Sequence, residues 1–352
     1  MVAPENASAR TRRAGLRHLA IAVVVLVLAG LVAFALSRLE LQRVGHSLVT
    51  ASPGWIALAL VLMSLAMAMR SVSWHQTLRA ALPDTRMPWG PVVRALMIGV
   101  MASALVPARI GEPSRVLVLS RRLDGRTSRL VPVVAGTVFS QTLINLAALA
   151  ILLAVSFTSV PLPSGHAAPI ALALALPLAL CLLVIIGPRL LALGRRSRRP
   201  RVTRVAYAIE RLLALARQGL VVFARPRFGS TAIGFQLLAW ALQWLACYMV
   251  ILALGLQSQT GPAAAAAILL AVNLSAVLPA TPSNVGVFQA ACLVVLAAYG
   301  VGAGQGLAYG IILQAVEVVT ALALGVPALL KEGLSWRDIR TSSLASESGA
   351  GS

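Results

Sequence analysis

The chain has few acidic residues, almost no lysine and few charged residues of any kind. Only 11% of its 352 residues are charged, whereas 59% are hydrophobic; soluble domains carry about 25% charged residues. This composition excludes an ordinary soluble enzyme domain. Lys331 is the only lysine, so the phosphate-binding loop of nucleotide hydrolases, which requires a lysine after its second glycine, is absent as well.

Cysteine and histidine are also scarce. Cys181, Cys247 and Cys292 all lie inside apolar runs, which favours small buried side chains over disulfides or metal ligands. The four histidines are scattered, and none is paired with a carboxylate at a motif spacing. We therefore expect no metal, no cofactor and no catalytic residue.

Long apolar runs take the place of charge, and a run of about 20 such residues crosses a bilayer as a helix. The expected fold is all-α: a polytopic membrane helical bundle with about six full spans plus two oppositely oriented re-entrant helical hairpins. Arginines precede the first run, which we expect to remain as an uncleaved span. The expected spans are 19–36, 55–69, 130–156, 168–190, 231–255 and 306–330.

The net charge of +20 follows from where the arginines lie. They cluster between apolar runs, as the positive-inside rule requires of cytoplasmic loops, so no nucleic-acid partner is expected. This pattern predicts an inner (cytoplasmic) membrane protein with both termini in the cytoplasm. The arginine-rich loop 191–230 includes an amphipathic stretch, 204–218, expected to lie on an anionic lipid surface. Arg70 is expected in a cytoplasmic loop after the second span.

Each of two apolar segments has both of its ends on one side of the membrane, so we expect it to enter the membrane and turn back to that side. Segment 91–122 has arginines at both ends, whereas 263–300 lies between uncharged outer segments. Helix breakers mark the two turns: Pro107 and Pro113 in the first, and Pro279, Pro282 and Gly286 in the second.

These assignments predict an inverted repeat, in which a first unit, about 55–156, and a second, about 231–330, have opposite orientations. Such repeats with broken helices are typical of transporters. The expected layout is a cytoplasmic tail (1–18), a transmembrane domain (19–332) and a disordered cytoplasmic tail (333–352).

Charged residues within apolar surroundings mark the candidate site. Glu112 and Glu317 are the two acids in such a context, and Arg109 and Arg115 flank Glu112. Two arginines suit a phosphate, and the N-termini of the second hairpin arms favour an anion. Alternatively, Arg109 or Arg115 forms a structural ion pair with Glu317.

Uncharged residues complete the expected ligand site. Gly111 follows the first turn, and Ser283 or Asn284 is expected to cap the helix after the second. Gln289 is a further expected ligand-binding residue, and Asn273 is expected to line a groove. Gln141 and Asn145 either line that groove or form interhelical hydrogen bonds.

The run Val106-Pro107-Ala108-Arg109-Ile110-Gly111-Glu112-Pro113-Ser114-Arg115 resembles the first signature of the lysylphosphatidylglycerol synthase transmembrane-region family of flippase-like domain proteins. The run 278–290, Leu-Pro-Ala-Thr-Pro-Ser-Asn-Val-Gly-Val-Phe-Gln-Ala, is similar to the second. The resemblance covers about residues 15–332. It implies that a lipid moves across the bilayer, with Arg109, Gly111, Glu112 and Arg115 matching the first signature and Pro279, Pro282 and Gly286 the second.

The chain departs from the family pattern at three positions. Gln289 stands where a glutamate is expected, and Gln141 and Asn145 stand where members often have Arg and Asp. Fewer carboxylates argue against a cationic aminoacyl headgroup, and we do not expect the chain itself to aminoacylate lipids.

The function predicted from the sequence is therefore a flippase for a phosphate-bearing lipid: a phospholipid, an aminoacyl-phospholipid or a glycolipid. The alternatives are a membrane transferase acting on a lipid-linked substrate, and a non-transporting scaffold that organises lipid-synthesis enzymes.

Overall fold

The computed structural model describes residues 41–83, 85–105, 111–122, 127–159, 221–276 and 284–333. Within these ranges all regular secondary structure is helical, which confirms the all-α class. The elements are α2 (Leu41–Thr50), α3 (Pro53–Ala81), α4 (Trp89–Leu105), α5 (Gly111–Arg122), α6 (Thr127–Ser159), α9 (Val221–Ala224), α10 (Pro226–Ala253), the 3₁₀ turn η1 (Leu256–Ser258), α11 (Pro262–Ser275), α12 (Val287–Ala298) and α13 (Ala303–Glu332).

Four helices are long and apolar enough to cross a membrane: α3, α6, α10 and α13. A helix of about 20 residues spans the ~30 Å hydrocarbon layer, and each of the four has at least 28 residues. Large apolar side chains on them, such as Val61, Ile151 and Val319, are exposed, as expected of surfaces that face lipid tails. The chain is a helical membrane protein.

The helices match four of the predicted spans, and the predicted spans 19–36 and 168–190 lie outside the described residues. The second span extends further than predicted. Helix α3 continues to Ala81 and ends before Pro83, because proline disfavours helical backbone in the residue before it. Arg70 therefore lies inside a spanning helix, and its predicted place in a cytoplasmic loop is wrong.

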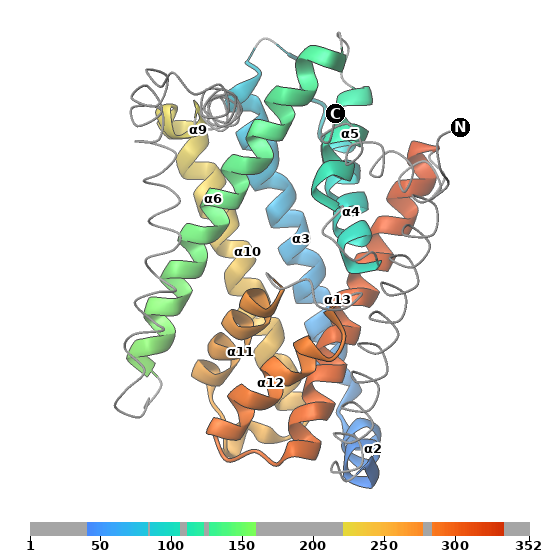
Figure 1. Cartoon of the computed structure of the whole chain (residues 1–352), viewed down its shortest axis with the longest axis vertical. Coiled ribbons are helices and arrows are strands. Elements are labelled where there is room, and N and C mark those ends of the chain that lie inside the picture. Colours follow the sequence, from blue (N-terminus) through green and yellow to red (C-terminus); the bar gives the residue numbers. More distant parts are fainter. Residues whose placement is uncertain are drawn as a thin grey trace, which may run out of the picture.

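Two short hairpins fill the spaces between the long helices. Helices α4 and α5 pack on each other and form the first hairpin, and α11 and α12 form the second. The two hairpins lie toward opposite ends of the molecule (Figure 1). Their arms, 12 to 17 residues long, fall short of the length needed to cross a membrane.

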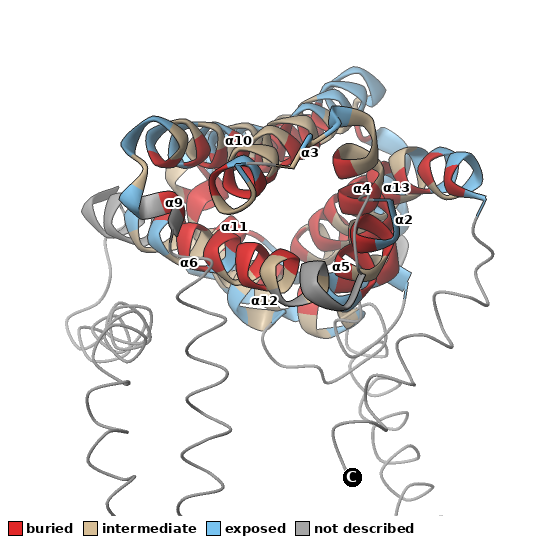
Figure 2. Cartoon of the chain, turned by 90° about the horizontal axis from the view of Figure 1, so that it is seen from above, coloured by how far each residue is buried: buried red, intermediate tan, exposed pale blue. Residues whose placement is uncertain are grey.

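The helix contacts follow a two-fold pattern that relates α3–α6 to α10–α13. Helices α3 and α10 pack against each other along their length, and each hairpin packs its first arm on a long helix of the other unit. Thus α4 packs on α13, and α11 packs on α6. Viewed from above, the helices surround a centre toward which their buried faces turn (Figure 2).

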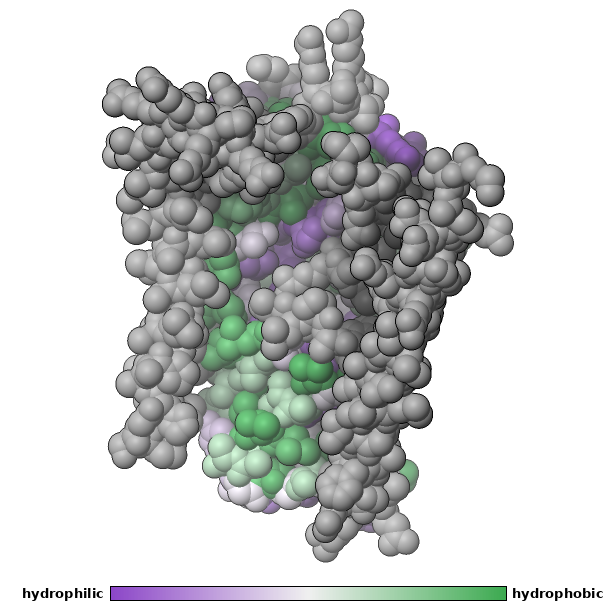
Figure 3. All heavy atoms as spheres, viewed as in Figure 1, coloured by the Kyte–Doolittle hydropathy of each residue, from purple (hydrophilic) through white to green (hydrophobic). Residues whose placement is uncertain are grey.

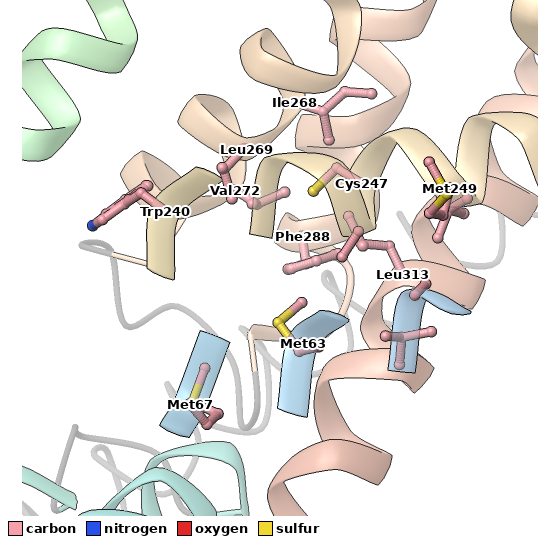
Figure 4. Close-up of a cluster of buried hydrophobic side chains, with 14 of the residues drawn as sticks. Met63, Met67, Trp240, Cys247, Met249, Ile268, Leu269, Val272, Phe288 and Leu313 are labelled. Atoms are coloured by element: carbon pink, nitrogen blue, oxygen red, sulfur yellow. The ribbon is translucent and has the colours of Figure 1, made fainter. Parts of the chain in front are cut away.

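An apolar cluster fills the part of the bundle where the second hairpin meets the long helices (Figure 4). It is rich in flexible methionine and in branched side chains, which fit irregular gaps between helices. Cys247 and Cys292 are buried there as free thiols, whereas Cys181 lies outside the described residues. The members labelled in Figure 4 are Met63, Met67, Trp240, Cys247, Met249, Ile268, Leu269, Val272, Phe288 and Leu313.

Candidate functional site

Charged side chains divide the described part of the molecule into two ends and an interior. One end, where α3 and α13 finish and α10 starts, carries nearly all of them. The opposite end, where α10 and α12 finish, has none among the described side chains. Those at the charged end are Arg79, Arg86, Arg94, Arg121, Arg122, Arg225, Arg227, Lys331 and Glu332. Four charged residues lie between the two ends and form what we call the interior group: Arg70, Glu112, Arg115 and Glu317.

Arg115 lies at the centre of the interior group, on α5. Its side chain is almost fully buried, and its Nη1 donates a hydrogen bond of 2.8 Å to Oε1 of Gln141 on α6. The guanidinium forms an ion pair with Glu112, one helical turn before it. Its other contact is the ring of Trp74, 5.1 Å away. Trp74 is in turn fixed by a 3.2 Å hydrogen bond from its Nε1 to Thr137 Oγ1.

Arg70, on α3, is partly buried and is the second cation of the interior group. Its Nη2 donates to Oε1 of Gln243 on α10, and its guanidinium carbon lies 5.9 Å from the centre of the Trp240 ring. We did not predict Arg70 as a site residue, because the apolar run before it is already long enough to predict a span that ends at residue 69.

Amide side chains connect the two arginines across four helices. Gln141, besides accepting from Arg115, donates from Nε2 to the backbone oxygen of Arg70 over 3.4 Å. One turn further along α6, Asn145 Oδ1 accepts from Gln236 Nε2 at 2.6 Å and from Trp240 Nε1 at 3.1 Å. Of the two alternatives predicted for Gln141 and Asn145, the interhelical hydrogen bonds are present; a groove-lining role stays a prediction. Figure 3 shows hydrophilic surface bordered by apolar surface in this part of the molecule, between α6 and the first hairpin.

Both arginines of the interior group keep an unused donor. The Nε–H groups of Arg70 and Arg115 are buried and have no hydrogen-bond partner. An unsatisfied buried donor costs free energy, and burying a charge at membrane depth costs a few kcal/mol by insertion scales. Such an arrangement is the kind that a bound anion would complete.

The first hairpin closes through glycine contacts. A side chain at Gly111 would collide with the Gly99 backbone oxygen and with Ser103, and one at Gly99 would lie 2.8 Å from the Gly111 oxygen. Gly111 is therefore the point at which α4 and α5 touch. Glu112 follows it, and its side chain is 52% exposed. Pro113 lies exposed in the same turn, whereas Pro107 and Arg109 lie outside the described residues.

The second hairpin closes through amides. Gly286, with φ at 88°, precedes α12, and Gln289 Oε1 accepts its N–H at 2.6 Å. Gln289 also donates to Gln314 on α13. Asn284 does not cap α12 as predicted: it has a left-handed backbone, and its Nδ2 donates to Ser275 Oγ at 3.1 Å.

Three other predicted positions of this hairpin lie outside the described residues: Pro279, Pro282 and Ser283. Asn273 is described, and its Nδ2 bonds back to the Leu269 carbonyl at 2.7 Å.

A buried acid missed by the sequence analysis lies at the end of α13. The Glu332 carboxylate is almost completely buried and bridges Arg94 on α4, at 2.5 Å, and Arg122 on α5, at 2.6 Å. Arg122 Nη2 also donates to the Glu332 backbone oxygen at 3.0 Å. The sequence did not mark Glu332 as a site residue, because it lies beside Lys331 at the end of the predicted transmembrane domain. Glu317, by contrast, forms no ion pair with Arg115 in the described part of the chain; Arg115 pairs with Glu112.

No group of three or more His, Cys, Asp or Glu side chains that could hold a metal ion occurs among the described residues. The interior arrangement consists of guanidinium, amide and indole groups with two carboxylates. Chemically, it can hold an anion through charge and hydrogen bonds.

Comparison with known protein families matches residues 19–325 to the family described as "Lysylphosphatidylglycerol synthase TM region". Among curated proteins, none matches the chain significantly.

Proposed function

The chain belongs to the lysylphosphatidylglycerol synthase TM region family, and from this premise we propose that it is a flippase. Family membership and the apolar spanning helices make it an integral membrane protein related to lipid metabolism. The proposed activity is movement of a phosphate-bearing lipid across the cytoplasmic membrane, with the headgroup passing through the interior of the bundle.

The observation that carries this proposal is the polar chain from Glu112 through Arg115 and Gln141 to Arg70 and Gln243. Charged groups at membrane depth are costly and mark pathways for polar cargo. A lipid headgroup that crosses the membrane needs such groups, because it loses its hydration there. Both arginines bond to amide side chains, and the hydrogen bond of His75, within the described part of the chain, is to a backbone oxygen and not to a carboxylate. This favours transport over transferase chemistry.

The hairpins support the same proposal. We infer that they are re-entrant and enter from opposite faces, since their arms are too short to span and lie at opposite ends. Inverted units with broken helices are the architecture of many alternating-access transporters. The basic end faces the cytoplasm by the positive-inside rule, so the first hairpin enters from that side, and both termini lie there.

The test is lipid movement in vesicles that contain the purified protein and a fluorescent phosphatidylglycerol, whose outer-leaflet fraction is bleached by a membrane-impermeant reductant. The variant is Arg115→Gln, and the control is Arg121→Gln, which removes an exposed arginine from the same helix. We expect a fall of about tenfold or more for Arg115→Gln, equivalent to about 1.4 kcal/mol, and wild-type rates for the control. Equal rates in all three proteins would contradict the proposal.

A further inference from the structure

Arg115 has two hydrogen-bonding side-chain partners, which differ in how far they are buried. Gln141 is buried on a spanning helix and accepts from Nη1 at 2.8 Å. Glu112 is half-exposed, lies on the same short helix three residues earlier, and pairs with Nη2. A half-exposed carboxylate can leave a guanidinium at little cost, because water replaces the lost contact. Glu112 is therefore the exchangeable partner.

Both arginines of the interior group keep donors that neither Glu112 nor the amides satisfy. Arg115 and Arg70 are joined through Gln141, which accepts from Arg115 and donates to the Arg70 backbone oxygen. Each arginine has a buried Nε–H without a partner, and each guanidinium lies over a tryptophan ring. A phosphate has the oxygens and the charge to bond to guanidinium forks in a bidentate way.

We propose that Glu112 is an internal counterion that occupies the place of the ligand's phosphate, and that Arg115 exchanges Glu112 for a phosphoryl anion held between Arg115 and Arg70. This inference rests on the proposed function only for the source of the phosphate, a lipid headgroup. After the exchange, the Glu112 carboxylate lies in the first turn of α5, where the helix dipole favours a negative charge. Re-pairing of Glu112 with Arg115 then releases the phosphate.

The exchange predicts opposite effects for two neighbouring substitutions. Removing the Arg115 charge removes the site for the anion. Removing the Glu112 charge removes a competitor, so the anion binds more tightly although a carboxylate–arginine contact has been lost. A purely structural ion pair predicts no such gain, since both substitutions would then only loosen the hairpin.

The experiment is calorimetric titration of the full chain in a neutral, phosphate-free detergent, with dioctanoyl phosphatidic acid as the probe. Inorganic phosphate carries the same headgroup chemistry without tails, and dioctanoylglycerol carries the tails without phosphate. The variants are Glu112→Gln, Arg115→Gln and Arg70→Gln, and the control is Arg79→Gln, an exposed arginine on the same helix as Arg70.

We expect Glu112→Gln to tighten binding of the phosphatidic acid several-fold, Arg115→Gln and Arg70→Gln to weaken it about tenfold or more, and Arg79→Gln to leave it unchanged. Dioctanoylglycerol should not bind. Weaker or unchanged binding in Glu112→Gln would overturn the exchange, provided that the variant melts like the wild type. Equal binding of inorganic phosphate would support the anion site and count against the lipid as its source, so the two proposals fail separately.

Discussion

The two hairpins share an architecture but differ in chemistry. Each has two short arms, one of which packs against the last helix of the bundle, α13: α4 in the first hairpin and α12 in the second. The first contains Arg94, Glu112, Arg115, Arg121 and Arg122 in its arms, whereas the arms of the second contain no Asp, Glu, Lys or Arg. Ion pairs with Glu332 hold the first hairpin to α13, and an amide pair, Gln289–Gln314, links the second.

This difference distinguishes what packing requires from what the proposed ligand site requires. Glycines allow close packing at both hairpins: Gly99 and Gly111 where α4 meets α5, and Gly310 where α13 meets Gln289 of α12. Of the two hairpins, only the first has charged side chains in its arms, and its Glu112 is half-exposed. The second hairpin thus shows what packing alone requires, and the first adds the charges of the proposed site.

The largest expected effect is a loss of stability when the close contact between α4 and α5 in the first hairpin is disturbed. In Gly111→Ala, the added methyl group would collide with the backbone oxygen of Gly99 and with the side-chain oxygen of Ser103. The backbone of Gly99 cannot move aside without shifting α4, so we expect a loss of about 3 kcal/mol in stability, at the upper end for overpacking. The matched control is Gly306→Ala on α13, where the nearest atom of the second hairpin, Leu293 Cα, would lie 3.6 Å away. That control should melt like the wild type in detergent. Equal melting of both variants would contradict the assigned role of Gly111.

Substitutions in the ion bridge between Glu332 of α13 and the first hairpin are expected to cost less stability. The cost should differ between removing the acid and removing the arginines. The double variant Arg94→Gln and Arg122→Gln leaves the Glu332 carboxylate buried without a cation, and we expect a loss of about 2 kcal/mol. Glu332→Gln should cost less, about 0.5 kcal/mol, because the two arginine side chains are 30% and 49% exposed and regain water. Melting of both proteins in detergent measures the difference. If Glu332→Gln lost as much stability as the double variant, the result would contradict the burial of the Glu332 carboxylate in this bridge.

The smallest expected effect is in the second hairpin. Gln289→Leu removes the hydrogen bonds to Gly286 N–H and to Gln314, and we expect a loss of about 1 kcal/mol, the scale of a helix cap. Binding of phosphatidic acid should remain at the wild-type level, since Gln289 belongs to the uncharged hairpin. A loss of binding without a loss of stability would place Gln289 at the ligand and contradict the comparison.

The sequence predicted the features that depend on apolar length and charge. Four of the spans, the two short hairpins and the position of Glu112 beside Arg115 follow from run length, proline breaks and arginine flanks. The interhelical bonds of Gln141 and Asn145 were one of two predicted outcomes, because a spacing of four residues places both on one face of α6.

The features that depend on which helices meet could not be predicted. Arg70 follows an apolar run that is itself long enough to suggest a span, and only its contact with Gln243, 173 residues away, reveals that α3 continues inward. Glu332 lies beside Lys331 in a sequence typical of a solvated helix end. Its burial comes from Arg94 and Arg122 of the first hairpin, which are distant in sequence.

The central claim, that the hairpins enter from opposite faces, is tested most directly by labelling single cysteines in a chain whose own three cysteines are replaced. Arg121→Cys marks the base of the first hairpin and Ala298→Cys the base of the second; both positions are exposed. In sealed, oriented vesicles, a membrane-impermeant maleimide should reach residue 121 only from the cytoplasmic side and residue 298 only from the other. Labelling of both residues from the same side would contradict the account.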